Sequence, residues 1–372
     1  MGLRLKPGHS LDRLVNGAIW IGPAVHGQAT ELVDETGVLW SICSRLDGTR
    51  SRQVLIEEAL AAEPARTAGS SVDDVTGMVD FLAESGWLLD PDAPLPAELS
   101  PHEVARYRRN AEFFSAVDLR PEMTGYRLQA RLKASRVAVL GLGGVGSAVA
   151  ASLAGCGVGQ LHCVDHDVLE LSNLNRQLLY AERDLGRSKV AACVGELRSR
   201  NSDITITGSD VQLDGPDAIV AAIKGCDAFV LCADKPLADI RHWANEAAYT
   251  SAVPWLTAGY AGPKYSLGCF IPGKTACYTC MWTNRMDSRE AAGLVFGDVG
   301  YHQFDDNPVI APTAQIAANF LAMETVKLLT GLEVQTAGRE LHRYVVDYDQ
   351  QYYLRATPRP DCRVGCGAAM SR

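Results

Sequence analysis

A strand that runs directly into a glycine-rich loop and a helix is the feature that most constrains how this chain folds. Residues 136–140 read RVAVL, in which an arginine precedes a continuous apolar run with two β-branched valines, and residues 141–146 read GLGGVG. Small apolar residues then predict a helix over 147–153, and Asp165 ends the next predicted strand, 19 residues after Gly146. This order is typical of the nucleotide-binding turn of an α/β fold.

The segments beyond this turn extend the same pattern. In chain order they are predicted as strand 159–165, helix 188–200, strand 203–209, helix 217–223 and strand 228–231, followed later by an apolar helix at 312–329. Strands and helices that alternate at this spacing predict parallel strands joined by right-handed crossovers. The predicted fold class is therefore α/β, with a doubly wound, mostly parallel, Rossmann-like sheet.

A smaller domain is predicted before the sheet. Four prolines among residues 90–101 predict a linker, with bounds at 91–103. The part before the linker, residues 1–90, shows short strands, helical patterns at 35–45, 52–62 and 72–84, and a final strand. That order suits a small winged-helix domain, which leaves residues 104–372 as the larger domain.

Composition excludes several kinds of partner. The 372 residues contain 35 Lys and Arg against 44 Asp and Glu, so a net charge of -9 opposes nucleic-acid binding. No apolar run reaches the ~18 residues of a membrane span, and the first residues lack the apolar core of a secretory signal. We therefore expect a cytoplasmic protein with no nucleic-acid and no membrane partner.

Charged residues after the glycine loop favour a triphosphate ligand. Arg176 and Lys189 follow Asp165 closely, and two cations suit a triphosphate better than the pyrophosphate of a dinucleotide. Asp234 follows the strand 228–231, where a carboxylate can hold Mg²⁺ at the ligand-binding edge of the sheet. On the glycine loop and Asp165 alone, NAD stays possible, and a glycine turn needed only for packing is the plainer alternative.

Four cysteines form two close pairs, Cys277 with Cys280 and Cys362 with Cys366. Four thiolates are the ligand set of a tetrahedral structural Zn²⁺, which has no open position for catalysis. The second pair has three intervening residues where two are commoner, so Cys366 is the weaker candidate. The other cysteines are expected to be small buried thiols.

These motifs together resemble the ThiF, MoeB and ubiquitin-activating superfamily of adenylyltransferases, over about residues 104–368. The resemblance implies a homodimer that uses Mg²⁺ and ATP to adenylate a carboxylate and carries a structural Zn²⁺. The nucleotide-binding residues that it implies are Gly141, Gly143, Gly144, Gly146, Asp165 on the ribose, Asp167 and Asn173, and the catalytic residues are Arg176, Lys189, Asp234 and Arg109. Arg109, in the RYRRN motif at 106–110, resembles an arginine that reaches the ATP of the other subunit. A solvated basic helix face is its plainer alternative.

The identity of the activated carboxylate depends on a further resemblance. No cysteine lies between Cys280 and Cys362, where superfamily members that form a thioester or persulfide usually carry their acceptor. With ADKP at 233–236 and AGY at 258–260, the chain resembles the MccB type of peptide-adenylating enzyme. The first 90 residues resemble the PqqD-like precursor-recognition domain, through LDGTR at 46–50.

The second resemblance implies that a ribosomally made precursor peptide is the substrate. The small domain would then hold the peptide by strand addition near residues 15–25. One alternative is activation of a sulfur-carrier or ubiquitin-like protein that ends in Gly-Gly. Another is a peptide-presenting scaffold without ATP chemistry, against which the intact set of charged residues argues.

Overall fold

The computed structural model describes residues 2–23, 29–120, 124–293 and 307–367. The chain forms two compact units, Met1–Arg131 and Leu132–Arg372. The boundary lies inside helix α7 (Gly125–Ala134), later in the chain than the linker that proline content predicts. Helices α5 (Pro101–Arg106) and α6 (Arg108–Val117) therefore group with the small unit. The functional division at 91–103 stays a prediction.

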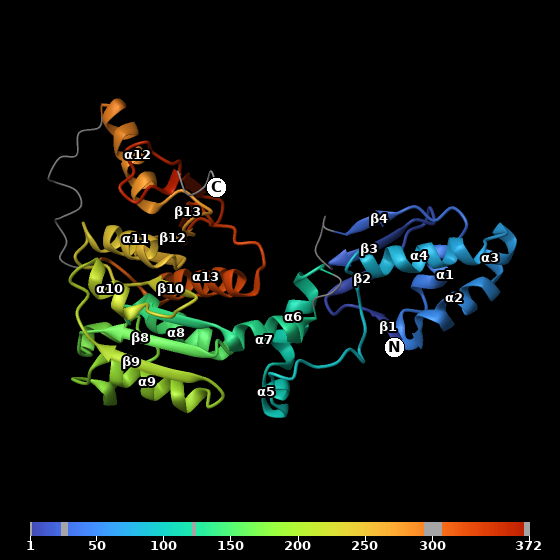
Figure 1. Cartoon of the computed structure of the whole chain (residues 1–372), viewed down its shortest axis with the longest axis horizontal. Helices are drawn as coiled ribbons and strands as arrows, with labels where there is room; N and C mark the ends of the chain where they lie inside the picture. Colours follow the sequence, from blue (N-terminus) through green and yellow to red (C-terminus); the bar gives the residue numbers. More distant parts are fainter. Residues whose placement is uncertain (1, 24–28, 121–123, 294–306, 368–372) are drawn as a thin grey trace. The chain divides into compact units, whose positions relative to one another are not determined.

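The small unit contains two three-stranded sheets and four short helices beside α5 and α6 (Figure 1). One sheet has the order β5-β1-β6, from β1 (Gly2–Leu5), β5 (Asp47–Ser51) and β6 (Leu88–Leu89), and the other is β2 (His9–Arg13), β3 (Ile19–Pro23) and β4 (Thr30–Leu32). The helices are α1 (Val38–Cys43), α2 (Arg52–Ala61), α3 (Glu63–Ala68) and α4 (Val72–Glu84). They pack on both sheets through a core that includes Ile21, Ile42 and Leu82, all fully buried.

The three helices predicted in this unit are present, and local chemistry explains their bounds. The first is shorter than predicted because Gly37, with φ 77°, starts it in the left-handed conformation. The third begins at Val72 because Ser71 and Asp74 form a capping box. Helix α3 was not predicted; its Pro64 lies in the first turn, where proline is tolerated.

The large unit is built on one eight-stranded sheet with the order β14-β13-β12-β11-β10-β7-β8-β9. Its strands are β7 (Arg136–Leu140), β8 (Gln160–Asp165), β9 (Thr205–Asp210), β10 (Ala228–Leu231), β11 (Trp255–Ala261), β12 (Lys264–Phe270), β13 (Arg339–Tyr344) and β14 (Gln351–Arg355). The five strands from β9 to β11 are parallel, and the last three are added antiparallel. The predicted fold class is confirmed.

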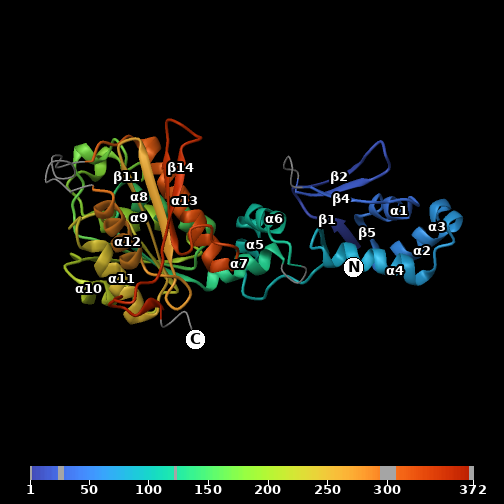
Figure 2. The same ribbon diagram turned by 90° about the horizontal axis from the view of Figure 1, so that it is seen from above.

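Helices cover both faces of this sheet, seen from a second side in Figure 2. They are α8 (Gly144–Cys156), α9 (Lys189–Arg200), α10 (Pro216–Ala222), α11 (Ile240–Ser251), α12 (Tyr278–Ala291) and α13 (Ala311–Thr330), with short 3-10 turns at Leu171–Asn173 and Glu182–Asp184. Helix α8 packs against α9 and α13, and α10 packs against α11. Because both faces are covered, the central strand β10 is apolar throughout and all four of its residues are buried.

The strand order places one crevice at the centre of the sheet. Strand β7 is followed along the chain by β8 on one side, whereas β10 lies on its other side. Ligands of doubly wound folds bind at such a switch point, outside the carboxyl ends of the strands. Among the helices of the described residues, none has the length and apolar character that crossing a membrane requires.

Candidate nucleotide site and metal centre

Backbone hydrogen bonds bring three loops together at the switch point. The N–H of Gly141 donates to Val164 O at 2.8 Å, which joins the glycine loop to the end of β8. The N–H groups of Cys232 and Ala233 both donate to Leu140 O, at 2.7 and 2.9 Å, which joins the loop after β10 to the end of β7. The segments predicted to hold phosphate, ribose and magnesium therefore share one edge of the sheet.

Two of the four loop glycines are required by packing. Gly141 has φ +90°, and a Cβ there would lie 2.4 Å from the nitrogen of Ala233. A Cβ on Gly146 would lie 1.7 Å from Gly141 O. At these two positions the plainer alternative, a turn that packs closely, accounts for the glycine.

Of the other two glycines, Gly143 borders open space at the start of α8, whereas Gly144 is buried against Arg176 and Ala314. A Cβ on Gly143 would come no closer than 3.9 Å to another residue, the amide nitrogen of Gln177, and one on Gly144 would lie 3.1 Å from Cγ of Arg176. Helix α8 begins at Gly144, and no side chain caps it. The first N–H groups of a helix attract anions when no side chain satisfies them.

The different roles of these glycines can be tested by a matched pair of variants. Gly143→Ala is expected to change the free energy of unfolding much less than Gly146→Ala does, because the new methyl group meets no protein atom closely. The methyl group should nevertheless weaken ATP binding by roughly tenfold or more, because it fills the space that a phosphate needs. Gly146→Ala should instead destabilise the fold by roughly 3 kcal/mol or more.

Calorimetric titration with ATP and thermal unfolding of both variants make this measurement. Unchanged ATP affinity in Gly143→Ala would contradict a phosphate site at the glycine loop.

Two polar side chains beside the glycine loop have atoms without partners. Nε of Arg176 and Oε1 of Gln177 are buried and make no hydrogen bond within the described part of the chain. The other end of Arg176 is held, since Nη1 donates to Ser172 O at 3.0 Å and to Asn175 Oδ1 at 2.9 Å. Buried polar atoms in folded proteins nearly always have partners, so this pair fits a site that a polar ligand completes. Gln177 was not singled out from the sequence, because its neighbours give no local signal.

Asp165 is positioned as a structural clip at the end of β8. It is only 9% exposed. Its Oδ2 accepts the N–H of Leu142 at 2.6 Å, and its Oδ1 accepts the N–H groups of His166 and Asp167 at 2.7 and 2.9 Å. The carboxylate thus fixes the glycine loop to the turn after β8. Its predicted contact with ribose stays a prediction.

Asp167 and Lys189 form an ion pair next to this clip. Lys189 Nζ donates to Asp167 Oδ2 at 2.8 Å, and the lysine side chain is 8% exposed while that of Asp167 is 52% exposed. Partial burial works to raise the pKa of Asp167, but the hydrogen bond and charge of Lys189 outweigh it and lower the pKa. Asp167 is therefore an ionised carboxylate with accessible oxygen.

The two remaining residues predicted on this edge differ in their surroundings. Asn173 is nearly buried, and its Oδ1 accepts the N–H of Glu170 at 3.3 Å in a local turn. Asp234 lies three residues past β10 and is exposed, and no described residue forms a hydrogen bond or ion pair with its carboxylate. Asp234 thus has both oxygens available for a cation.

Arg109 belongs to the small unit. It lies in the first turn of α6 and is exposed, beside the surface ion pair of Arg108 with Glu112. Its predicted contact with the nucleotide of another subunit stays a prediction.

The four paired cysteines converge as a metal site would require. Their sulfur atoms all lie within 4.8 Å of one another, and the closest pairs are Cys277 with Cys362 at 3.7 Å and Cys280 with Cys366 at 3.6 Å. Tetrahedral coordination with Zn–S bonds of ~2.3 Å places sulfur atoms ~3.8 Å apart. The donor set and its spacing therefore fit Zn²⁺, and Cys366 takes part although its pair has the longer spacing.

Local structure explains how both pairs reach the site. Cys277 precedes α12, and its Sγ accepts the N–H of Cys280 at 3.4 Å. In the second pair Gly365 has φ +63°, a conformation that glycine adopts readily, and its N–H donates to Cys362 O at 3.0 Å. This turn accommodates the extra residue and brings Cys366, which is fully buried, back to the cluster.

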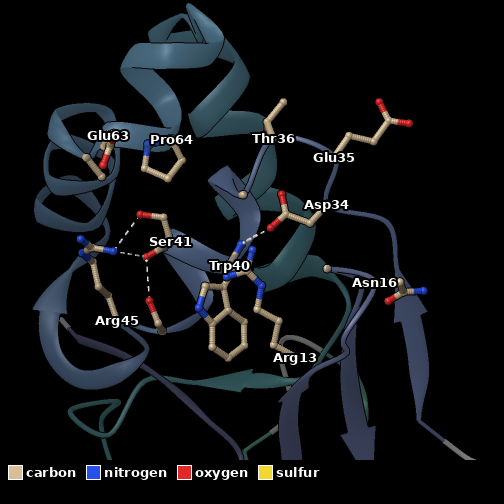
Figure 3. A pocket seen from close by; sticks show the side chains of 14 residues that line it. Arg13, Asn16, Asp34, Glu35, Thr36, Trp40, Ser41, Arg45, Glu63 and Pro64 are labelled. Atoms are coloured by element: carbon tan, nitrogen blue, oxygen red, sulfur yellow. Dashed lines mark hydrogen bonds between the residues drawn. The ribbon is translucent and has the colours of Figure 1, made fainter.

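The small unit contains a pocket of about 690 Å³, drawn in Figure 3. Trp40 lies on it with the Arg13 guanidinium 5.7 Å from its ring centre. The carboxylate of Asp34 accepts the main-chain N–H of Trp40 at 2.9 Å, and Nη1 of Arg45 donates to Oγ of Ser41 at 2.8 Å. The adjacent segment predicted to bind a peptide, 15–25, is described only as far as residue 23.

Comparisons with known proteins extend these observations. The ThiF family model matches residues 116–364. Molybdopterin-synthase adenylyltransferase of Salmonella typhimurium is 32% identical over 276 residues, which cover 73% of this chain and 99% of the relative. Sulfur carrier protein ThiS adenylyltransferase of Escherichia coli is 31% identical over 242 residues, covering 65% of this chain and 89% of the relative.

A similar fold extends over nearly the whole chain. The crystal structure of E. coli MccB with AMPCPP and MccA has a TM-score of 0.74 at 23% identity, covering 98% of this chain and 99% of that chain. The names of the two relatives given above, by contrast, fit the sulfur-carrier alternative at least as well as they fit a peptide substrate. The resemblance of the first 90 residues to a PqqD-like domain stays a prediction.

Proposed function

Because this chain belongs to the ThiF family and is an adenylyltransferase, we propose that it activates the C-terminal carboxylate of a polypeptide with ATP. A carboxylate oxygen attacks the α-phosphorus, the bond from that phosphorus to the bridging oxygen breaks, and pyrophosphate leaves. The observation that carries this proposal is the open glycine loop beside the unpartnered atoms of Arg176 and Gln177.

Each charged residue has a part in this proposal. Arg176 and Lys189 neutralise the triphosphate, and Asp234 would hold Mg²⁺, which would supply further positive charge beside the phosphates. Asp165 shapes the loop through backbone N–H groups, so the accessible oxygen of Asp167 is the better acceptor for ribose hydroxyls. The cysteine cluster holds Zn²⁺ as a structural tie, since four thiolates leave no position for substrate.

The first candidate for the substrate is a sulfur-carrier protein. Relatives at 31 and 32% identity are named as adenylyltransferases of molybdopterin synthase and of the sulfur carrier ThiS. The match to the first covers 99% of its length, so the similarity extends over nearly the whole of that relative.

The second candidate is a ribosomally made precursor peptide. The family model begins at residue 116, which leaves most of the small unit outside it, whereas the MccB fold covers 98% of the chain. A unit with its own core and a polar pocket can hold a remote part of a peptide and raise the effective concentration of its C-terminus.

Exchange of radiolabelled pyrophosphate into ATP tests the proposal and separates the candidates. We expect exchange to depend on either a carrier protein ending in Gly-Gly or a short peptide encoded beside the gene. The matched control is the same polypeptide with an amidated C-terminus, which has no carboxylate and should be inactive. Exchange with neither substrate, or exchange that amidation leaves unchanged, would overturn the proposal.

The proposed homodimer predicts that two variants with strongly reduced activity complement each other. Arg109→Ala removes the arginine offered to the other subunit, and Asp234→Ala removes the magnesium ligand of its own subunit. When equal amounts are mixed, about half of the dimers contain one chain of each variant, and each of these has one of its two sites intact. Mixing should therefore restore up to about a quarter of the wild-type activity. If subunits exchange and activity does not return, Arg109 acts within its own chain or outside the reaction.

A further inference from the structure

The end of helix α6 is bonded to Lys6, which directly follows strand β1. Nζ of Lys6 donates to the main-chain oxygen of Asp118, the residue after α6, at 2.7 Å. Both residues are 3% exposed, although Lys6 comes from the start of the chain, next to β1. A buried lysine rarely lacks a specific partner, so this contact fixes the end of the helix.

Two glycines let the last turn of α6 and the chain just after it approach the rest of the small unit closely. A Cβ on Gly86 would lie 1.7 Å from Leu119 O, and one on Gly8 would lie 3.1 Å from Cβ of Ala116. Both glycines have positive φ, 78° and 77°. The surface beneath Leu119 is thus fitted to main-chain atoms and has no room for a side chain at Gly86.

Charge pairing strengthens the same contact. The carboxylate of Asp118 accepts the N–H of Arg120 at 3.0 Å and its guanidinium at 2.6 to 3.1 Å. Burial lowers the pKa of Lys6, and the charge of Asp118 opposes that shift. Removing the ammonium group would leave the buried carbonyl of Asp118 without this donor and would take a favourable charge away from the buried carboxylate.

The first turn of the same helix carries Arg109. Arg109 and Asp118 are nine residues apart, roughly 14 Å along a helix. Along the helix, Ala111 and Phe114 are buried, and a Cβ on Gly125 of α7 would lie 1.8 Å from Ala111 O. Helix α6 is therefore packed along its length and held at its end, with the arginine exposed at its start.

We propose that Lys6, Gly86 and the turn at 118–120 form a brace through which the small unit positions Arg109 for the adenylation reaction. The proposal rests on the role of Arg109 in the proposed function. Lys6 touches no reacting atom here and is a positioning residue. The small unit then serves the chemistry as well as the capture of substrate.

Lys6→Met tests the brace, with Arg52→Met as the matched control. The control removes the exposed ion pair of Arg52 with Asp80 in the same unit. In Lys6→Met, backbone amides of α6 should exchange with deuterium roughly tenfold faster, while those of α4 keep their protection. The kcat of pyrophosphate exchange should fall roughly tenfold with little change in KM for ATP, and Lys6→Arg should retain most activity.

A double-mutant cycle separates positioning from general destabilisation. In the Arg109→Ala background, Lys6→Met should cause no further loss of kcat, because the group that it positions is already gone. Losses that multiply, or unchanged protection of α6 in Lys6→Met, would overturn the proposal. If Lys6→Met unfolds the small unit, Arg120→Met replaces it, because this variant removes the guanidinium bonded to the Asp118 carboxylate in the same turn. Deuterium exchange of α6 and the kcat of pyrophosphate exchange are then measured in that variant, with the same expected results.

Failure of the proposed function has a different signature. In that case the wild-type chain shows no exchange activity with any polypeptide, while deuterium exchange still reports whether Lys6 holds α6.

Discussion

Asp234→Ala is expected to lower polypeptide-dependent pyrophosphate exchange by roughly a thousandfold or more. The carboxylate lies at the switch point, and no described residue binds it, so its expected partner is the Mg²⁺ of the triphosphate. Because Asp234 is exposed and supports no packing, the substitution should change the free energy of unfolding by no more than about 0.5 kcal/mol, as is usual at the surface.

The matched control for this prediction is Asp239→Ala. Asp239 is also exposed, lies five residues further along and precedes α11 without capping it through its side chain. The control removes the same charge from the same region and should retain nearly full activity. Rates of pyrophosphate exchange measured against Mg²⁺ concentration decide the matter. Asp234→Ala activity within a few-fold of the control would remove Asp234 from the site.

Loss of the zinc centre is expected to have the largest effect on stability. Cys277→Ser replaces one of four converging thiols and also the acceptor of the Cys280 N–H, so the free energy of unfolding should fall by several kcal/mol. For a unit of this size that corresponds to a decrease in Tm of roughly 10 °C. Cys156→Ser, at a half-buried cysteine outside the cluster, should change stability by less than about 1 kcal/mol.

Metal analysis and calorimetry together test the zinc prediction. We expect one Zn²⁺ for each chain in the wild type, and strong chelators should lower the Tm of the wild type toward that of Cys277→Ser. ATP binding measured below the new Tm should persist, because the metal has no part in the chemistry. A metal-free protein with the wild-type Tm would contradict a structural role.

The parallel half of the sheet could be predicted from the sequence because its signals are local. The run at 136–140, the glycines after it and the acid at 165 are each close to their partners in the chain. Among the antiparallel pairings, β11 with β12 and β13 with β14 join neighbouring segments, whereas β12 with β13 joins segments far apart in the chain. Residues 264–268 pair with residues 340–344, and neither segment shows its partner in its own pattern.

The sequence could predict which residues belong to the candidate site, but it could not predict which contacts each of them makes. Asp165 and Asp167 are both acids at the end of one strand, and only the tertiary structure shows that the first binds Leu142 N–H while the second binds Lys189. Gln177 gives no sequence signal, because what marks it is an unpartnered oxygen in a buried place. Ala314 of α13 meets Gly144 from a helix far along the chain, which no local pattern could indicate.

The spacing of the cysteine pairs also orders events during synthesis of the protein. Cys277 and Cys362 are 85 residues apart, with α13, β13 and β14 between them. A chain leaving the ribosome therefore presents two thiols well before the other two, and two thiolates bind zinc far less tightly than four. Capture of the metal must wait until β14 has been made, so tight zinc binding marks chains that have completed the antiparallel edge of the sheet.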